Sequence, residues 1–392
     1  MSGQLLIAGG GIGGLAAAVA ARRAGWEARV FEQAPAFSEV GAGLQLGPNA
    51  TRVLRAWGLL EAARPLACAP QRLVARDAGS GAEIAALPLG EAFELRYGAP
   101  YLTLHRADLH QVLLQAAQDG GAMLHTGVRI DGFEDVGEAV RLRLGACADQ
   151  PEGDALAAAD GLWSVLRQQL LNDGAAVASD HVALRGMAQV ADLPARWRVP
   201  EVTAWLGPRL HLVTYPVQGG RMLNIVCVAQ QATQGDRTGW DHTAAAESLR
   251  SVTAGAWGGL QELLQAVPSW GQWVLHDRPV VAGAQQMARG RVALLGDAAH
   301  PMRPYLAQGA AMALEDAFEL GRALSPVDGA VIDVPTALRR YALNRWERSA
   351  RVQRRSLRNA DIFHATGALR LARDVAMRSL GGRLMDLPWL YG

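Results

Sequence analysis

The sequence contains no lysine, so arginine carries its side-chain positive charge, apart from any protonated histidine. This absence excludes a phosphate-binding loop of the GxxxxGK type and a lysine Schiff base with pyridoxal phosphate. It also excludes a catalytic pair of serine and lysine. Arginine stays protonated near neutral pH, so none of the 38 arginine side chains is expected to act as a base.

Cysteine and long apolar runs are also scarce. The three cysteines, Cys68, Cys147 and Cys227, match no zinc or redox spacing, so we interpret them as reduced structural residues and expect no metal centre. The longest apolar runs fall well short of the roughly 18 residues that span a bilayer. No signal-peptide pattern precedes the first predicted strand, so we expect a cytoplasmic protein. A net charge of +1 favours neither nucleic acid nor an anionic membrane as a partner.

The composition is that of an ordinary globular protein, with 50% hydrophobic and 19% charged residues, and 392 residues suggest about two domains. Between 175 and 285, strands rich in β-branched and aromatic residues predominate, and Gly219-Gly220 predicts a hairpin turn. We therefore predict one domain in two parts, 1–174 and 286–334. A β-rich domain at 175–285 is inserted between them, and a helical region at 335–392 follows. Strands are predicted at 4–8, 27–32, 122–128, 156–160, 181–190, 202–206, 209–216, 221–229 and 291–295, and helices at 15–24, 45–63, 105–118, 165–171, 243–264, 310–324 and 335–378.

The clearest motif is Gly9-x-Gly11-x-x-Gly14, which lies between the first strand and the first helix. Glycine allows a tight turn, a close approach of the backbone to a pyrophosphate, and close packing of helix on strand. The free amides and the dipole of the helix N-terminus then favour an anion. Glu32, at the end of the second strand, can accept hydrogen bonds from an adenosine ribose. The alternative is an ordinary tight turn, and the motif alone does not distinguish FAD from NAD.

A second motif, Gly296-Asp297-Ala298-Ala299-His300-Pro301, follows the predicted strand 291–295. An aspartate at a strand end suits the hydroxyls of a ribityl chain, and the helix opened by Gly309 and Ala310 can place amides near a flavin ring. The run GDAAHPMRPYLAQGAAMALEDA resembles the second FAD motif of the single-component flavin-dependent aromatic hydroxylases. That group includes salicylate, 3-hydroxybenzoate and 6-hydroxynicotinate hydroxylases. The resemblance implies an α/β FAD-binding fold of the Rossmann-like, glutathione-reductase type, with an inserted mixed β-sheet substrate domain and C-terminal helices.

The resemblance extends over most of the chain. Asp160-Gly161-x-x-Ser164-x-x-Arg167 resembles the middle motif of the group, which contacts FAD and the reduced nicotinamide cofactor. The segment from His105 to Leu109 resembles one whose arginine, here Arg106, reaches the flavin, and Val128 lies where the group packs main chain against adenine. The cofactor-binding residues implied by these motifs are Gly9, Gly11, Gly13, Gly14, Glu32, Arg106, Val128, Asp160, Gly296, Asp297, Gly309 and Ala310.

The predicted substrate site lies in the strand at 209–216. Residues two apart in a strand share a face, so His211 and Tyr215 project together, on the order of 13 Å apart along the backbone. The resemblance implies that His211 and Tyr215 line the substrate pocket and bind or deprotonate a substrate hydroxyl. Without the resemblance, a single strand histidine is more often a hydrogen-bonded structural residue. We interpret His300 as positional and Cys227 as a core residue, and an arginine such as Arg221 or Arg303 is a candidate partner for a substrate carboxylate.

The expected function is that of an FAD-dependent monooxygenase that consumes NADH or NADPH and O2. In look-alike enzymes, a flavin C4a-hydroperoxide transfers a hydroxyl group to a phenolic or hydroxylated aromatic carboxylate. The expected reaction is most like that of 3-hydroxybenzoate 6-hydroxylases or salicylate hydroxylases. A decarboxylative hydroxylation like that of 6-hydroxynicotinate 3-monooxygenases is the alternative, and the motifs resemble the 3-hydroxybenzoate and 6-hydroxynicotinate enzymes about equally. Two other classes were weighed: a flavin oxidase or dehydrogenase without oxygen insertion, and a non-enzymatic binding protein on the same fold. Dimers are common among the look-alikes, which leaves a homodimer open.

Overall fold

A computed structural model describes residues 3–38, 42–145, 150–231, 245–330 and 332–392, so Cys147 lies outside the described residues. The chain forms two compact units, each assembled from three stretches of sequence. Unit 1 consists of Met1–Val40, Leu109–Ala176 and Arg278–Arg355, and unit 2 of Gly41–Asp108, Val177–Asp277 and Ser356–Gly392. The units thus divide the chain differently from the predicted domains, because 41–108 groups with the inserted β-rich segment.

A six-stranded sheet forms the centre of unit 1. Its strand order is β17 (Ala288–Arg289), β18 (Val292–Leu294), β11 (Ala155–Ala158), β1 (Gln4–Ala8), β2 (Glu27–Phe31) and β7 (Met123–His125). All pairs are parallel except β17 with β18. Leu5, Leu6 and Ile7 of β1 are fully buried, as expected for a central parallel strand that is covered on both faces.

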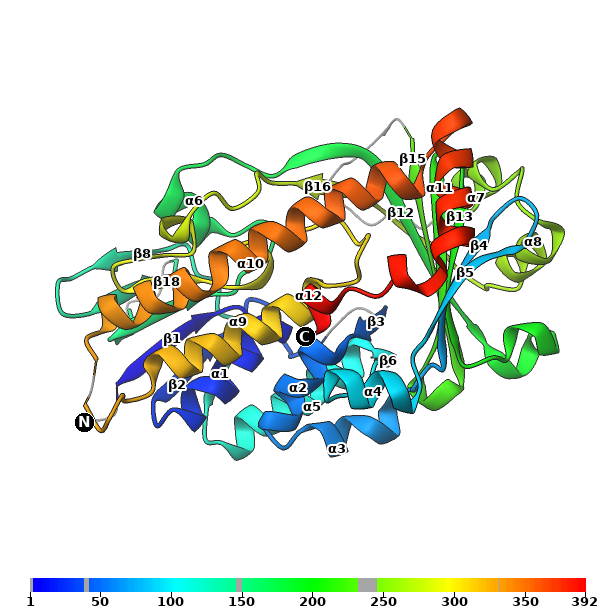
Figure 1. The fold of residues 1–392 in the computed structure, drawn as a ribbon. Coiled ribbons are helices and arrows are strands. Elements are labelled where there is room, and N and C mark those ends of the chain that lie inside the picture. Colours follow the sequence, from blue (N-terminus) through cyan, green and yellow to red (C-terminus); the bar gives the residue numbers. More distant parts are fainter. Residues whose placement is uncertain (1–2, 39–41, 146–149, 232–244, 331) are drawn as a thin grey trace. The chain divides into compact units, whose positions relative to one another are not determined.

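Helices α1 (Ile12–Arg23) and α9 (Gly309–Leu324) pack against each other in unit 1 (Figure 1). The contact is close: a Cβ atom at Gly321 would lie 3.0 Å from Cβ of Ala20. Unit 1 also contains α5 (Arg106–Asp119, from Leu109 on), α6 (Val165–Leu171) and a small sheet of β8 (Gly132–Asp135), β9 (Val140–Arg143) and β10 (Glu152–Gly153).

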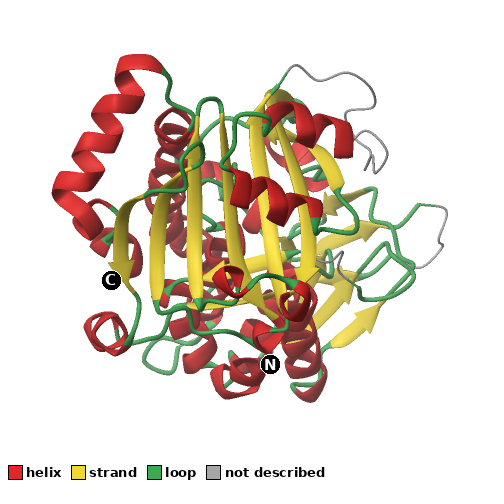
Figure 2. Ribbon diagram, turned by 90° about the vertical axis from the view of Figure 1, so that its right-hand side faces the viewer, coloured by secondary structure: helices red, strands yellow, loops and turns green. Residues whose placement is uncertain are grey.

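A seven-stranded sheet forms the centre of unit 2. Its strand order is β16 (Gly271–Asp277), β12 (Val177–Gln189), β15 (Met222–Gln230), β14 (Leu210–Val217), β13 (Glu201–Gly207), β4 (Arg72–Asp77) and β5 (Glu83–Pro88). One face packs an apolar cluster that includes Leu184, Leu212 and Cys227 against α7 (Ala245–Val252) and α8 (Gly258–Gln265). Short helices lie on the face of the sheet that Figure 2 turns to the reader. Because side chains alternate along a strand, the opposite face of the sheet is formed by a separate set of residues, which need not be apolar.

The remaining elements of unit 2 come from all three of its stretches. They are β3 (Gly43–Leu46), β6 (Leu102–His105), α2 (Pro48–Ala56), α3 (Leu60–Ala63), α4 (Glu91–Tyr97), α11 (Gly367–Leu380) and α12 (Pro388–Tyr391). Strands β3 and β6 pair in antiparallel fashion. The long helix α10 (Val334–Phe363) contributes residues to both units.

Several predicted elements are wrong in extent. The helix expected over 45–63 is instead the end of β3, then α2 and α3, because Pro48 starts a new helix and Gly58 adopts φ +72°. The strand expected over 122–128 ends at His125, two residues before Gly127 with φ +69°. The helix expected over 335–378 is two helices, separated before Gly367. In the expected helix at 243–264, residues 243 and 244 lie outside the described residues, and the rest forms α7 and α8.

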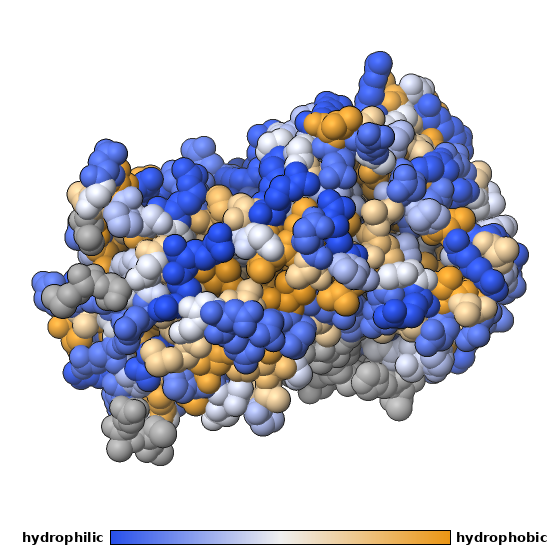
Figure 3. Space-filling model, turned by 90° about the horizontal axis from the view of Figure 1, so that it is seen from below, coloured by the Kyte–Doolittle hydropathy of each residue, from blue (hydrophilic) through white to orange (hydrophobic). Residues whose placement is uncertain are grey.

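Strands β4 and β5 were not predicted, nor was the pairing of β4 with β13 that joins 72–77 to the large sheet. No helix within the described residues is long and apolar enough to cross a membrane. Hydrophilic side chains lie between apolar ones over the face shown in Figure 3. Polar side chains other than lysine therefore make up the hydrophilic part of this face.

The glycine loop allows a matched stability test. A Cβ atom at Gly14 would lie 1.9 Å from the carbonyl oxygen of Gly9, whereas one at Gly13 would make ordinary contact, 3.6 Å from Ala313. Gly14→Ala should therefore lower the melting temperature of the cofactor-free protein. Gly13→Ala should leave it unchanged or raise it, since alanine favours a helix by about 1 kcal/mol over glycine. Differential scanning fluorimetry measures both, and equal losses would contradict the proposed difference in packing.

Candidate functional site

The glycine motif of unit 1 forms a tight turn between β1 and α1. Gly9 has φ +97°, and a Cβ atom there would lie 2.5 Å from the carbonyl oxygen of Ala159. Helix α1 begins after Gly11, which provides no side-chain cap for the first turn. The first N–H groups of a helix have no intrahelical partner, so this terminus can receive an anion at close backbone range.

Glu32 holds this turn in place. Its carboxylate accepts hydrogen bonds from the N–H of Gly10 (2.7 Å) and from the N–H of Ala34 (2.8 Å). Val128 donates its N–H to the carbonyl oxygen of Glu32 (2.9 Å). A carboxylate has about four acceptor positions, so these two bonds leave capacity for ribose hydroxyls. Val128 lies three residues beyond the end of β7 rather than within a strand.

The second motif follows β18 directly. Gly296 adopts φ +55°, and Asp297 is exposed while Ala298, Ala299 and His300 are buried. Helix α9 begins at Gly309, and the side chain of its cap residue, Gln308, forms no capping hydrogen bond with the first turn. A Cβ atom at Gly309 would meet no described atom within 4 Å. The motif therefore presents one exposed carboxylate and one uncapped helix terminus.

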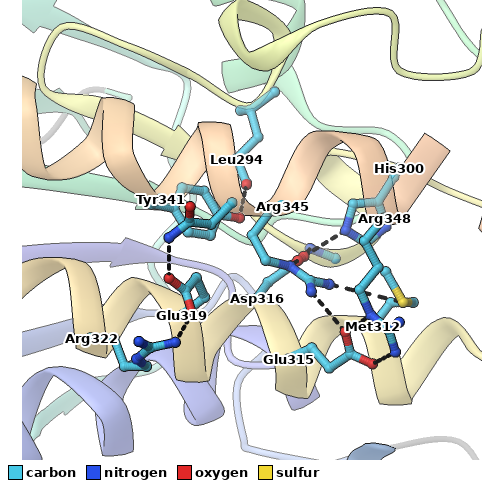
Figure 4. Close-up of polar contacts among 12 residues, drawn as sticks. Leu294, His300, Met312, Glu315, Asp316, Glu319, Arg322, Tyr341, Arg345 and Arg348 are labelled. Carbon is cyan, nitrogen blue, oxygen red and sulfur yellow. Dashed lines mark hydrogen bonds and ion pairs between the residues drawn. The ribbon is translucent and has the colours of Figure 1, made fainter. Parts of the chain in front are cut away.

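A buried carboxylate connects this motif to its surroundings. Asp316 is fully buried on α9 and accepts hydrogen bonds from the N–H of Gly296 (2.9 Å) and from Nε of Arg345 (2.7 Å). Its Oδ2 also lies 2.5 Å from Nε2 of His300. Figure 4 shows Asp316 between Arg345 of α10 and His300. His300 is therefore held in position by Asp316, as interpreted from the sequence.

Neighbouring charges extend this network between α9 and α10. Glu315 accepts hydrogen bonds from Arg345 (2.7 Å) and Arg348, and Tyr341 donates its hydroxyl to the carbonyl oxygen of Leu294 (2.8 Å). Burial alone would raise the pKa of Asp316, but the His300 and Arg345 side chains and the bond from Gly296 lower that pKa overall. The partners of Asp316 thus offset the unfavourable effect of burying its negative charge.

The middle motif contacts the same loop. Arg167, only 1% exposed, donates hydrogen bonds to the carbonyl oxygens of Ala298 (3.0 Å) and Ala299 and forms an ion pair with Asp173. Asp160 accepts a hydrogen bond from the hydroxyl of Ser164 (2.6 Å), and burial raises the pKa of Asp160 despite this bond. The structure therefore brings the middle and second motifs together within unit 1.

The predicted catalytic pair lies in unit 2. His211 and Tyr215 share one face of β14, opposite the apolar cluster, and both are buried. Nδ1 of His211 and Nε2 of His364 are joined by a hydrogen bond of 2.9 Å, and the His181 ring packs against the His364 ring. Burial, His364 and His181 together lower the pKa of His211 well below 6.5. His211 is therefore neutral at neutral pH. No group of three or more potential metal ligands was found within the described ranges.

Tyr215 belongs to a hydrogen-bonded group of its own. Its side chain bonds that of Gln45, whose Oε1 accepts the hydroxyl of Tyr101 (2.7 Å). Burial raises the pKa of Tyr215 to about 12, although Arg185 and Gln45 act in the opposite direction. Tyr215 is therefore a neutral hydrogen-bond donor at neutral pH. Gly43 lies against it: a Cβ atom there would lie 2.5 Å from the Tyr215 ring.

Arg106 begins α5 and groups with unit 2, whereas the other predicted cofactor-binding residues lie in unit 1. Sequence reasoning missed Asp316, His364, Arg185 and Gln45. Asp316 could have been found in the sequence, because two adjacent acidic residues, Glu315 and Asp316, stand in an otherwise apolar helix. His364 had no signal, because its partner lies 153 residues earlier in the chain.

Comparison with known proteins agrees with this geometry. The family described as an FAD binding domain matches residues 3–356. The chain is 39% identical to a 3-hydroxybenzoate 6-hydroxylase of Polaromonas naphthalenivorans (strain CJ2), covering 99% of this chain and 95% of that protein. It is 35% identical to a 6-hydroxynicotinate 3-monooxygenase of Bordetella bronchiseptica, covering 90% of each. The solved structure of Klebsiella pneumoniae HpxO with FAD and uric acid matches with a TM-score of 0.86 and 25% identity, covering 97% of this chain and 94% of that one.

The Asp316 network predicts a large stability effect. Asp316→Asn removes one partner of a buried ion pair and should lower the free energy of unfolding by about 3–5 kcal/mol. Because the folded pKa of Asp316 is lowered, its charge contributes stability above the unfolded value of about 3.9 and loses it as the pH falls further. The difference between the wild type and Asp316→Asn should therefore narrow below about pH 4 in urea unfolding curves.

Arg322 provides the matched control, because it pairs with Glu319 on the same helix but its side chain is 59% exposed. Exposed ion pairs contribute about 0–1 kcal/mol, so Arg322→Met should change the unfolding free energy little. A difference between the wild type and Asp316→Asn that stays constant down to pH 2 would contradict a lowered pKa at Asp316.

Proposed function

The chain belongs to the FAD binding domain family, and on this premise we propose that it hydroxylates an aromatic ring that carries a hydroxyl and a carboxylate group. The chain is an FAD-dependent monooxygenase, and FAD is its cofactor. The resemblance to the flavin-dependent aromatic hydroxylases and the predicted α/β fold class are confirmed.

The residues of unit 1 fit this cofactor. A Cβ atom at Gly9 or Gly14 would collide with backbone, and the uncapped start of α1 suits a pyrophosphate. We assign the ribose to Glu32, the ribityl hydroxyls to the exposed carboxylate of Asp297, and the flavin ring to the start of α9. The full proposed set is Gly9, Gly11, Gly13, Gly14, Glu32, Arg106, Val128, Asp160, Gly296, Asp297, Gly309 and Ala310.

One observation in unit 2 carries the choice of reaction: a neutral, buried imidazole and a neutral phenol share one face of β14. A neutral imidazole can accept a proton, and a neutral phenol can donate a hydrogen bond. In our proposal His211 takes the proton of the substrate hydroxyl and Tyr215 donates to the resulting phenolate oxygen. Deprotonation makes the ring carbons ortho and para to that oxygen nucleophilic.

FAD held by these residues would supply the oxygen chemistry, with NADH or NADPH as reductant and O2 as oxidant. One oxygen atom would enter the ring as a hydroxyl group and the other would leave as water. The chain's own residues bind and orient the ring and exclude water. His364 holds Nδ1 of His211 in a hydrogen bond, which favours Nε2 as the atom that faces the substrate oxygen. His364 is thus a positioning residue for His211.

The relatives favour two substrates. The 39% identical relative acts on 3-hydroxybenzoate and the 35% identical one on 6-hydroxynicotinate. We place 3-hydroxybenzoate first, because other relatives with the same name match over 99–100% of this chain. Hydroxylation of 6-hydroxynicotinate with loss of its carboxylate is the second candidate. A cytoplasmic location, which was expected from the sequence, is part of the proposal. NADH rather than NADPH as the reductant, and a homodimer, which the look-alikes leave open, complete it.

The proposed function predicts substrate-dependent oxygen insertion. FAD-loaded protein should oxidise NADH faster when 3-hydroxybenzoate is present, and the product mass should increase by one oxygen atom. His211→Ala should lower the rate of product formation by about 10²- to 10⁴-fold, the usual contribution of a general base. Oxygen uptake and mass spectrometry over a panel of 3-hydroxybenzoate, salicylate, 4-hydroxybenzoate and 6-hydroxynicotinate measure this. FAD binding without oxygen insertion into any ring would instead favour an oxidase or dehydrogenase.

The role of His364 predicts a change in the pH profile. His211 must be neutral to accept a proton, so kcat/KM should fall at acid pH as His211 becomes protonated. His364 is one of the causes that lower the pKa of His211. His364→Gln should therefore raise that pKa and move the acid limb of the kcat/KM profile to higher pH. A uniform loss of kcat with an unmoved acid limb would mean that His364 is only structural.

A further inference from the structure

The polar face of the large sheet in unit 2 contains hydrogen-bond donors without acceptors. Nε of Arg185 and Nδ2 of Asn224 are buried and have no hydrogen-bond partner among the residues that the structure describes. Oδ1 of Asn224 accepts the N–H of Gly43 (2.8 Å), which fixes the amide orientation and makes Nδ2 a donor. Buried donors of this kind are rare, because each lost hydrogen bond costs about 1–3 kcal/mol.

Arg185 is unusual in a second way. Charged side chains inside a protein are nearly always paired, yet Arg185, a half-buried residue whose Nε atom is fully buried, forms no ion pair with any carboxylate in the described part of the chain. Its guanidinium lies over the Trp273 ring, 4.0 Å from the ring centre. Burial lowers the pKa of Arg185 to about 10, and Arg106 acts in the same direction while Tyr215 opposes it. The side chain remains a cation at neutral pH, with an aromatic surface beside it and no negative partner.

Strand register places these donors beside the proposed catalytic pair. Asn224 lies directly opposite Tyr215, and Arg185 is opposite Val226, which is opposite Val213. Arg185 and Asn224 are therefore diagonal neighbours on adjacent strands, about 7–8 Å apart, within reach of a long side chain. From Arg185 to His211 the path is two strands across and two residues along, or about 10 Å by 7 Å between Cα atoms.

We propose that Arg185 and Asn224 form the binding site for the carboxylate of the aromatic substrate. The proposal rests on the proposed function, since it places the carboxylate at one side of the ring and the hydroxyl at His211 on the other. A carboxylate has several acceptor positions and one negative charge, so it satisfies the guanidinium and the amide N–H together. Arginine is suited to this task because its planar donors match the geometry of a carboxylate.

The two arginines considered from the sequence fit less well. Arg221 is exposed, next to the hairpin between β14 and β15, and Arg303 is not part of the sheet that contains His211. A half-buried cation such as Arg185 makes a stronger contact than an exposed one, because water screens it less. The alternation of β12 places Arg185 on the same face as His181, and the sequence pattern could have indicated this.

Paired ligands test the proposal. FAD-loaded full-length protein, without NADH, is titrated calorimetrically with 3-hydroxybenzoate and with 3-hydroxybenzamide, which has nearly the same shape but no charge. The wild type should bind the benzoate at least about 10-fold more tightly than the amide. Arg185→Met should weaken benzoate binding by about 30- to 5000-fold, the range for loss of one partner from a hydrogen-bonded charge pair, and amide binding by less than about 3-fold.

Asn224→Asp is the sharper variant. The new carboxylate still accepts the N–H of Gly43, but it places a negative charge beside Arg185. The ligand-free protein should therefore have a higher melting temperature, while benzoate binding should be lost. Arg185→Met should not lower the melting temperature of the ligand-free protein, since it removes a partly buried charge that has no carboxylate partner. Arg250→Met, an exposed substitution on α7, is the control and should change neither property.

Equal weakening of benzoate and amide binding in Arg185→Met, or normal benzoate binding by Asn224→Asp, would overturn the proposal. So would a rise in the KM for NADH with unchanged benzoate affinity, since the anion would then belong to the nicotinamide cofactor. The pair 6-hydroxynicotinate and 6-hydroxynicotinamide repeats the test for the second candidate substrate. Charge-dependent binding without oxygen insertion would support the carboxylate site and refute the proposed reaction. Oxygen insertion at an unchanged rate in Arg185→Met would support the proposed reaction and refute the carboxylate site.

Discussion

The buried carboxylate of Asp316 is the interaction on which the structure of unit 1 most depends. It receives donors from three separate parts of the chain: the backbone at Gly296, the ring of His300 and the guanidinium of Arg345. A fully buried charge is tolerated only when it is paired and hydrogen-bonded, so these three partners hold each other in place. The exposed carboxylate of Asp297 and the start of α9 take their positions from this arrangement. A stability requirement thus determines the geometry of the proposed cofactor site.

Local rules predicted the elements in which backbone geometry is the constraint. The positions of Gly9, Gly11 and Gly14 indicated a tight turn. The elements around this turn, β1, α1 and β2, begin and end within a few residues of the predicted bounds. The same holds for α6 and α9. Prediction failed where contacts with residues far away in the sequence overrode the structure that the local pattern favours. Apolar periodicity over 45–63 is compatible with one helix, but pairing with β6 draws residues 43–46 into a strand instead.

The proposed substrate site shows the same limit. Alternation along β14 was sufficient to place His211 and Tyr215 on one face. It could not supply their neighbours, because His364 follows α10 and Gln45 belongs to β3, both remote in sequence. The ordinary histidine pKa of about 6.5, which holds without such neighbours, does not apply to His211 either. Burial beside two other imidazoles instead lowers that pKa well below 6.5, so the base is neutral without any negative partner.

Two sets of polar side chains in the protein interior differ in how far the protein itself satisfies them. In unit 1, Asp316 and Arg167 have partners for their charges, and those partners tie the backbone together. On the polar face of unit 2, Arg185 and Asn224 retain donors that no described residue satisfies. A buried donor without an acceptor lowers the stability of the ligand-free protein. Such a donor can nevertheless persist at a binding site, where a bound ligand supplies the missing acceptor. The apolar cluster on the opposite face of the same sheet supplies hydrophobic burial that can offset this cost. One sheet therefore separates stability and recognition onto its two faces, and the alternation of side chains along β12, β14 and β15 makes that separation possible.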